Sequence, residues 1–386
     1  MRTLINLGCK LNQYEGSCLI KKFGYIRNLV IVNTCCVTRE AVTKSLKKFK
    51  QAIKKYPQST IIATGCTCRL YPEKFSQAHQ VIDNIQRLDI INDVLPTPEK
   101  SRYFLKIEDG CTEPCTFCIV SKIRNNIQSK SLEKIKTEIS WAQSLGYKEI
   151  VLVGANIGLY GVDRGLSLTD MVRMLQTIEG LPRIRLSSIE PRFITEELIE
   201  NLKEIPFCRH FHIPIQSADD YILTQMGRGY DGLHLKRVIG LIKESFVDVA
   251  IGGDIIVGFP GEGEKEFLNT YNFVKSTPFT HLHVFPYSPR PLTNSYRLGD
   301  PIPHYIKKER LWLLKNLIAE KNFEFRKRIL HKTFDIIIEN NGNKSLSGLT
   351  DNYVRVVVQN GCEKGKPVGV RITDVSKEFT CGVVVA

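Results

Sequence analysis

Three cysteines stand close together at one place in the chain, where the sequence reads Cys111-Thr-Glu-Pro-Cys115-Thr-Phe-Cys118. A [4Fe–4S] cluster has four irons, and each iron usually takes one cysteine thiolate. Three cysteines would leave one iron open to a substrate or cofactor, because no fourth cysteine follows nearby. The alternatives are a zinc site or buried free thiols. A structural zinc site needs four ligands, and no histidine near the segment offers the fourth.

The C-x3-C-x2-C spacing and Phe117 before the last cysteine resemble the signature of the radical S-adenosylmethionine (SAM) superfamily. In that superfamily the open iron binds the amino and carboxylate groups of SAM, and an electron from the cluster cleaves SAM to a 5′-deoxyadenosyl radical. The resemblance implies a [4Fe–4S] cluster on Cys111, Cys115 and Cys118, with SAM as a second cofactor. It leaves open whether Phe117 packs on the adenine of SAM or on the protein.

Three further cysteines, Cys9, Cys35 and Cys66, each follow a strand-like segment. These segments cover residues 3–7, 29–33 and 60–64, and helical segments at 12–23 and 38–56 separate them. The alternation predicts a parallel sheet, in which the carboxyl ends of the strands form the ligand crevice. We therefore expect the cysteines to meet at one sheet edge and hold a second cluster, although free cysteine is also common as a small buried hydrophobe. Cys35 and Cys66 are preferred over Cys36 and Cys68, because each comes first after its strand.

Strand-like segments recur six times further on, at residues 103–108, 149–153, 183–187, 210–215, 251–257 and 281–285. Helical segments alternate with them, which predicts a partial (β/α)6 barrel with its chemistry at the carboxyl ends of the strands. The candidates for binding SAM at these ends are Gly154, Asn156, Ser188, Glu190, Gln216 and Val257, together with Phe117. No catalytic residue is assigned beyond the cluster ligands. His210 and His212 share one face of their strand, and with no third ligand evident they are interpreted as core or substrate-cavity residues.

The last part of the chain predicts a long basic helix at 306–330, followed by short strands at 333–339, 353–358, 368–372 and 381–385. Such a pattern is typical of a small all-β barrel, a fold that often binds single-stranded RNA. From Lys332 onward, however, the sequence contains seven Lys and Arg residues and six Asp and Glu residues, so this part of the chain has almost no net charge. Most of the phosphate contact is therefore expected upstream, from the lysine-rich helix at 43–56, the long helix and the loop after Cys118.

The totals of the sequence are consistent with this organisation. A chain of 386 residues is long enough for two or three domains, and twelve cysteines without a disulfide pattern favour metal binding. The net charge of +14 indicates a polyanionic partner such as nucleic acid. No apolar run is long enough to span a bilayer, and the N-terminus reads as a strand rather than a leader, so a cytoplasmic protein is expected.

With these residues placed, the whole chain resembles the methylthiotransferases of the radical SAM superfamily. The resemblance implies an N-terminal Fe–S domain at 1–95, a radical SAM domain at 97–325 and a TRAM RNA-binding domain, an OB-like barrel, at 327–386. The motifs that carry it are Gly8-Cys-Lys-Leu-Asn-Gln-Tyr-Glu15, Val32-Asn-Thr-Cys35, Thr64-Gly-Cys66, Gly154-Ala-Asn-Ile-Gly158, Arg185-Leu-Ser-Ser-Ile-Glu-Pro191, His212-Ile-Pro-Ile-Gln-Ser217, Asp254-Ile-Ile-Val-Gly-Phe-Pro-Gly-Glu262 and Gly348-Leu-Thr-Asp-Asn-Tyr353.

The first and fourth of these motifs resemble the branch that acts on N6-threonylcarbamoyladenosine (t6A) at position 37 of tRNA. The implied reaction attaches a methylthio group to adenine C2, using two [4Fe–4S] clusters and SAM. The implied partners are the anticodon stem-loop of tRNA, an electron donor such as a flavodoxin or ferredoxin, and a sulfur donor, with no membrane. The alternatives are isopentenyladenosine in tRNA, a ribosomal-protein aspartate, or a non-catalytic Fe–S or zinc protein that binds RNA.

Four features depart from the pattern of that family. The interval between Cys9 and Cys35 is short, and the loop after Cys118, Arg124-Asn-Asn-Ile-Gln-Ser-Lys130, has fewer arginines than usual. Ala218 and Leu292 stand where glycine is usual. These departures concern substrate contacts and efficiency, whereas all six cysteines expected to bind the clusters are present.

Overall fold

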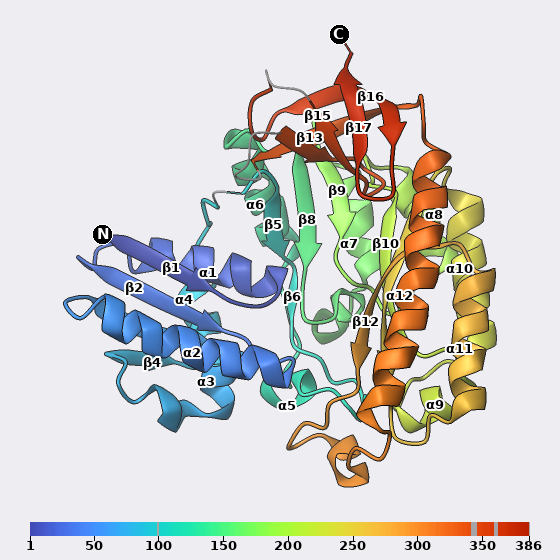
Figure 1. The fold of residues 1–386 in the computed structure, drawn as a ribbon. Helices are drawn as coiled ribbons and strands as arrows, with labels where there is room; N and C mark the ends of the chain where they lie inside the picture. Colours follow the sequence, from blue (N-terminus) through green and yellow to red (C-terminus); the bar gives the residue numbers. More distant parts are fainter. Residues whose placement is uncertain (99, 341–345, 359–361, 386) are drawn as a thin grey trace.

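The computed structural model describes residues 1–98, 100–340, 346–358 and 362–385, so positions 341–345, 359–361 and 386 of the expected third domain lie outside it. Three units follow one another along the chain (Figure 1). Within the described residues, none of the helices has both the length and the apolar character needed to cross a bilayer.

The first unit is a four-stranded parallel sheet in the order β1-β2-β3-β4. Its elements are β1 (Arg2–Asn6), α1 (Lys10–Lys22), β2 (Leu29–Thr34), α2 (Arg39–Lys55), β3 (Thr60–Gly65), α3 (Cys66–Leu70), β4 (Gln80–Ile82) and α4 (Asn84–Ile91). Every residue of β2 is buried, as expected for a strand covered on both faces. Leu29 and Ile31 pack toward α1 and α4, whereas Val30 and Val32 pack toward α2, because side chains alternate along a strand.

The second unit is a partial barrel of six parallel strands. One sheet contains β5 (Tyr103–Lys106), β8 (Glu149–Val153) and β9 (Arg183–Leu186), and the other contains β10 (His210–Gln216), β11 (Ala250–Val257) and β12 (Phe279–Pro286). Single bridges, Ile184 to Phe207 and Ser188 to His212, join the two sheets. Between β5 and β8, β6 (Glu108–Asp109) pairs antiparallel with β7 (Gln128–Ser129), and the segment between them carries α5 (Val120–Ile123).

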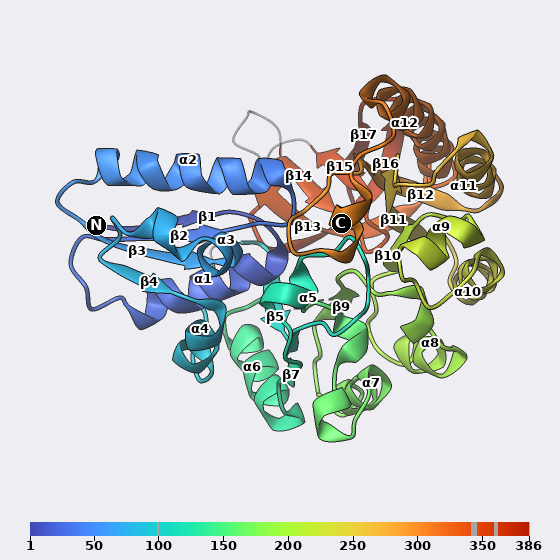
Figure 2. The same cartoon turned by 90° about the horizontal axis from the view of Figure 1, so that it is seen from below.

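Helices cover the outer face of the barrel, as the view from below shows (Figure 2). They are α6 (Leu132–Ser144), α7 (Leu168–Leu175), α8 (Glu196–Lys203), α9 (Asp220–Gln225), α10 (Gly232–Ser245), α11 (Glu264–Ser276) and α12 (His304–Lys327). The expected N-cap at Ser131 is present, since its hydroxyl accepts from the Lys134 N–H at 3.3 Å. The last helix packs Leu314 and Ile318 into the same core as the barrel strands.

The third unit is a closed barrel in the order β13-β14-β15-β17-β16. Its strands are β13 (Thr333–Asn340), β14 (Leu346–Leu349), β15 (Arg355–Val358), β16 (Pro367–Val375) and β17 (Thr380–Val384). This confirms the predicted α/β architecture with a small C-terminal barrel. The sequence did not predict β14, which is short and contains Gly348. The strand expected to begin at Tyr353 begins two residues later, because Tyr353 has a φ of 66° and cannot continue a strand.

The third unit covers the amino-terminal ends of the barrel strands. The Tyr353 ring stacks on His210 at the start of β10, with ring centroids 4.0 Å apart. The Arg185 guanidinium donates to the carbonyl of Thr350 at 2.9 Å. The first unit lies beside the barrel, with α1 packed against β5 and β8 (Figure 1). The carboxyl ends of the barrel strands therefore remain uncovered by the third unit.

Candidate functional site

Cys111, Cys115 and Cys118, called here the loop cysteines, lie between β6 and α5 and form no disulfide. All three are half-buried. The backbone fixes the loop at two points, because Cys111 N–H donates to the Arg124 carbonyl at 2.8 Å and Val120 N–H donates to Cys118 Sγ at 3.4 Å. Burial raises the pKa of Cys111 to about 12, and the proximity of Cys118 and Cys115 adds to the rise. Three free thiols held together in this way fit a cluster that binds them as thiolates.

Two polar groups at strand ends contact the loop cysteines. Asn156, after β8, directs its Nδ2 toward Cys111 Sγ at 3.9 Å and toward Glu190 Oε2 at 3.4 Å. Arg228 donates to Cys115 Sγ at 3.1 Å, and its guanidinium lies 3.8 Å from Glu190. Asn156 and Glu190 were expected at this rim. Arg228 was not, because it lies in the turn between α9 and α10 rather than at a strand end.

The other expected rim residues take different positions. Gly154 and Gln216 are half-buried at the ends of β8 and β10, and Ser188 is exposed where its backbone bridges to His212. Val257 is 1% exposed at the end of β11, where its side chain packs in the core of the barrel. Phe117 packs against a cluster of barrel-wall side chains that includes Phe259 and Tyr287.

Cys9, Cys35 and Cys66, called here the sheet-edge cysteines, meet at the carboxyl edge of the first sheet. Burial raises the pKa of Cys35 to about 11, and Cys66 and Cys9 are close enough to raise it further. Cys9 is accessible to water but lies among protein groups, so desolvation raises its pKa as well. Glycines allow this approach, since at Gly65, where φ is +98°, a Cβ would lie 2.4 Å from the Thr34 carbonyl.

The neighbouring cysteines occupy different surroundings. Cys36 is fully buried beside Ile119 and Ile123, and Cys68 packs in the core under α2. The Cys36 thiol hydrogen-bonds to Cys66 and lowers the pKa of Cys66, and Arg124 lowers that pKa in the same direction. A thiol held toward its thiolate form is suited to bind a metal.

A buried ion-pair network lies between the sheet-edge and loop cysteines. Glu15 of α1 is fully buried and pairs with Arg87 Nη2 at 2.7 Å, Lys106 Nζ at 2.9 Å and Arg124 Nη2 at 2.9 Å. Although burial alone would raise the pKa of Glu15, Arg124, Arg87 and Lys106 together hold it well below the usual range. The prediction that the loop after Cys118 offers its charge to phosphate is therefore wrong for Arg124, which is 6% exposed.

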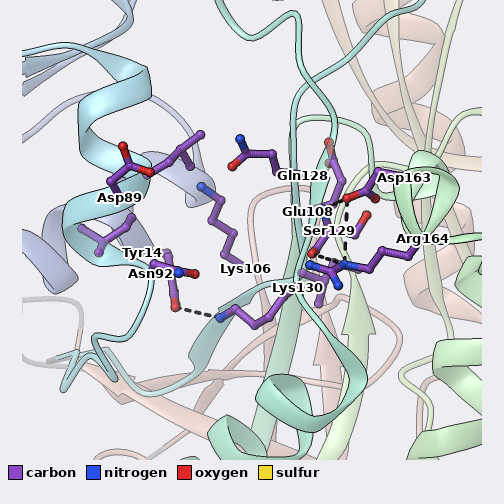
Figure 3. A pocket seen from close by; sticks show the side chains of 13 residues that line it. Tyr14, Asp89, Asn92, Lys106, Glu108, Gln128, Ser129, Lys130, Asp163 and Arg164 are labelled. Atoms are coloured by element: carbon purple, nitrogen blue, oxygen red, sulfur yellow. Dashed lines mark hydrogen bonds and ion pairs between the residues drawn. The ribbon is translucent and has the colours of Figure 1, made fainter.

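A separate cavity of about 270 Å³ opens between α4 and the β6–β7 pair (Figure 3). Its lining groups bind one another: Lys130 Nζ donates to Tyr14 Oη at 3.0 Å, and Arg164 Nε donates to the Ser129 carbonyl at 2.7 Å. It contains none of the cysteines. This cavity is therefore separate from both sets of cysteines.

The barrel carries a cluster that the sequence analysis found only in part: His212 was expected as a core or substrate-cavity residue without further ligands, and the structure places Asp254 and His283 beside it. His212 Nε2 lies 3.0 Å from Asp254 Oδ2, and His283 Nδ1 lies 3.6 Å from Asp254 Oδ1. These three ligand atoms lie within 4.8 Å of one another, a geometry that could hold a metal ion, although His212 and Asp254 already lie in close contact with each other. The alternation of His281 and His283 along β12 was a signal that could have found this cluster.

Two family models match the chain. The model described as the radical SAM superfamily matches residues 105–274. The model described as uncharacterized protein family UPF0004 matches residues 2–86.

Curated relatives match nearly the whole chain. The threonylcarbamoyladenosine tRNA methylthiotransferase MtaB of Aquifex aeolicus is 33% identical, over 95% of this chain and 98% of the relative. That of Thermotoga maritima is 34% identical, over 96% and 94%. The tRNA-2-methylthio-N(6)-dimethylallyladenosine synthase of Clostridium tetani is 31% identical, over 95% and 92%.

Among solved structures, the radical SAM methyltransferase TsrM of Kitasatospora setae has a similar fold. Its TM-score is 0.54 at 12% identity, and the match covers 74% of this chain and 68% of that one.

Proposed function

The chain belongs to the radical SAM tRNA methylthiotransferases, and on that premise we propose that it converts t6A at position 37 of tRNA to its 2-methylthio derivative. The branch is supported by the MtaB relatives, which are named for threonylcarbamoyladenosine and match at 33–34% identity. The observation that carries the proposal is the presence of two separate sets of three cysteines, one at each side of the Glu15–Arg124 ion pair. Because the proposed substrate is a tRNA, we propose that the enzyme acts in the cytoplasm.

Membership of this family means that the enzyme uses SAM and a [4Fe–4S] cluster. We assign that cluster to the loop cysteines and a second [4Fe–4S] cluster to the sheet-edge cysteines. When bound, the cofactors supply the radical and the sulfur chemistry that no side chain can provide. The residues proposed to contact SAM are Phe117, Gly154, Asn156, Ser188, Glu190, Gln216 and Val257.

The chain's own groups have distinct parts in this proposal. Glu190 is 5% exposed and offers a carboxylate to the amino group of SAM. Arg192 holds this carboxylate through a hydrogen bond of 3.0 Å, and Arg228 lies 3.8 Å from it while donating to Cys115. Asn156 links Glu190 to Cys111. These side chains partly cover the loop cysteines and limit the access of water to them, which protects a radical from side reactions.

The remaining partners are proposals of the same kind. The first unit, at 1–95, would deliver the sulfur, the second, at 97–325, would generate the radical, and the third, at 327–386, would bind the anticodon stem-loop as a TRAM domain. A flavodoxin or ferredoxin would reduce the clusters, and a separate donor would renew the sulfur.

Mass spectrometry of tRNA nucleosides from a deletion strain tests the proposal. We expect 2-methylthio-t6A to disappear and t6A to accumulate, and we expect the wild-type gene to restore the product. Intact 2-methylthio-t6A, with the isopentenyladenosine product missing instead, would assign the chain to the other tRNA branch. If both products persist, a protein substrate is the next candidate, and failure to form 5′-deoxyadenosine from SAM would favour a non-catalytic protein.

A further inference from the structure

Lys10, the first residue of α1, lies where the first unit packs against the barrel. Its charge acts on His210 of β10 and His283 of β12, while Arg185 of β9 and Glu149 of β8 act on Lys10. His210 and His283 lie in one three-stranded sheet of the barrel, and Arg185 and Glu149 lie in the other. The ammonium therefore lies close to strands of both sheets, and Lys10 directly follows Cys9, the proposed cluster ligand at the N-cap of α1.

This ammonium has no partner. Lys10 is half-buried, and it makes no hydrogen bond or ion pair with any residue in the described part of the chain. Its neighbours Arg102 and Arg185 are paired, with Glu339 at 2.8 Å and Glu149 at 2.8 Å. The neighbouring carboxylate of Glu149 is already paired with Arg183 and Arg185. A cation that is partly removed from water without a carboxylate of its own is costly, and an anionic ligand would remove that cost.

The part of the barrel near this ammonium is polar. His283 is 61% exposed, and it lies beside the His212–Asp254 pair described above. These groups can donate and accept hydrogen bonds with a ligand that carries amide and hydroxyl groups. An apolar ligand would leave both the ammonium and these polar groups without partners.

We propose that Lys10 binds the carboxylate of the threonylcarbamoyl group and thereby selects a substrate with an anionic N6 substituent. The inference rests on the proposed function, because only t6A among the tRNA candidates carries this charge. Adenine C2 and N6 flank N1 on one edge of the base. A residue next to Cys9, the proposed ligand of the cluster that delivers sulfur to C2, is therefore well placed to hold the N6 substituent. An isopentenyl group would leave the ammonium unpaired, which a polar site rejects strongly.

The test measures binding of three anticodon stem-loops to the reconstituted full-length protein. The stem-loops carry t6A, its methyl ester, or unmodified adenosine at position 37. We expect the wild type to bind the acid about tenfold or more tightly than the ester, as for a charge-assisted hydrogen bond. Lys10→Met should bring this ratio close to one while leaving ester binding and iron content unchanged. Lys10→Arg should retain most of the preference.

Lys236→Met is the matched control, since it removes one exposed lysine from α10 on the outside of the barrel and should leave the ratio unchanged. An equal affinity of the wild type for acid and ester would overturn the inference, even if Lys10→Met failed to fold. A full preference in Lys10→Met would also overturn it. If the wild type formed no 2-methylthio product on the t6A stem-loop, the proposed function would fail instead, and that readout is separate from the acid-to-ester ratio.

Discussion

Arg124 donates from Nη2 to Glu15 Oε2 at 2.9 Å and thereby joins the two units that carry the cysteines. The same residue accepts the Cys111 N–H at its carbonyl, at 2.8 Å. Its guanidinium also lowers the pKa of Cys66, after the larger effect of Cys36. One arginine therefore contacts a loop cysteine through its backbone and a sheet-edge cysteine through its charge. This pairing fixes how far apart the two proposed clusters can lie.

We expect Glu15→Gln to destabilise the chain by about 3 to 5 kcal/mol, because it leaves Arg87, Lys106 and Arg124 buried without their shared carboxylate. Urea unfolding followed by circular dichroism measures this change. The control is Glu197→Gln, which breaks an exposed pair with Arg173 and should cost less than about 1 kcal/mol. A similar loss in both variants would show that the buried network does not hold the units together.

A second prediction concerns pH. Burial opposes ionisation of Glu149, but Arg185 and Arg183 lower its pKa to about 2. Because the folded pKa lies below the unfolded value of about 4.3, this carboxylate stabilises the fold above that pH, by about 3 kcal/mol. The stabilisation is lost as the pH falls from about 4 toward 2. We expect Glu149→Gln to lower the free energy of unfolding at pH 7 and the difference from wild type to shrink below about pH 4.

Urea unfolding at pH 7, 5, 4 and 3.5 measures that difference. Glu200→Gln, at an exposed pair with Lys203, is the control and should stay within about 0.5 kcal/mol of wild type throughout. A Glu149→Gln difference that is constant with pH would contradict the prediction.

The third prediction concerns metal content. Reconstituted wild type should hold about eight irons per chain if both sets of cysteines bind four-iron clusters. Cys9→Ala and Cys111→Ala should each retain about four, but only Cys9→Ala should still cleave SAM to 5′-deoxyadenosine. Cys381→Ser, in the third unit, is the control and should keep the wild-type content. If Cys9→Ala kept its full iron content, the second cluster would not lie on the sheet-edge cysteines.

Much of this arrangement could be predicted from the sequence, because its signals are local. A strand ends where its apolar run ends, so the positions of Cys35 and Cys66 after β2 and β3 followed from residue spacing. The six barrel strands followed from alternating segments in the same way. Asn156 and Glu190 came from strand ends, and the structure brings both of them beside Cys111 or its neighbours.

The contacts between units could not be predicted, because they depend on how the units dock. Glu15 and Arg124 are 109 residues apart, and nothing near Arg124 in the sequence marks it as buried. Lys10 belongs to a sequence motif, whereas its position beside the barrel depends on the packing of α1 against β5. Strand β14 was missed because four residues with a glycine give too weak a pattern.

The last prediction concerns the lysines of α2. This helix begins four residues after Cys35, at Arg39, and it buries Phe49 and Ala52 against the first sheet while its lysines are exposed. A tRNA whose base reaches the sheet-edge cysteines would therefore bring phosphates near this face. We expect the triple variant Lys44→Gln, Lys47→Gln and Lys48→Gln to weaken tRNA binding roughly tenfold or more at low salt. The slope of log affinity against log salt should fall by about 2, since each lost phosphate contact contributes about 0.7 to 0.9.

The control replaces Lys236, Arg237 and Lys243 of α10 with glutamine, which removes the same charge from the opposite side of the barrel. Equal losses in the two triple variants would mean that α2 acts only through the net charge of the protein.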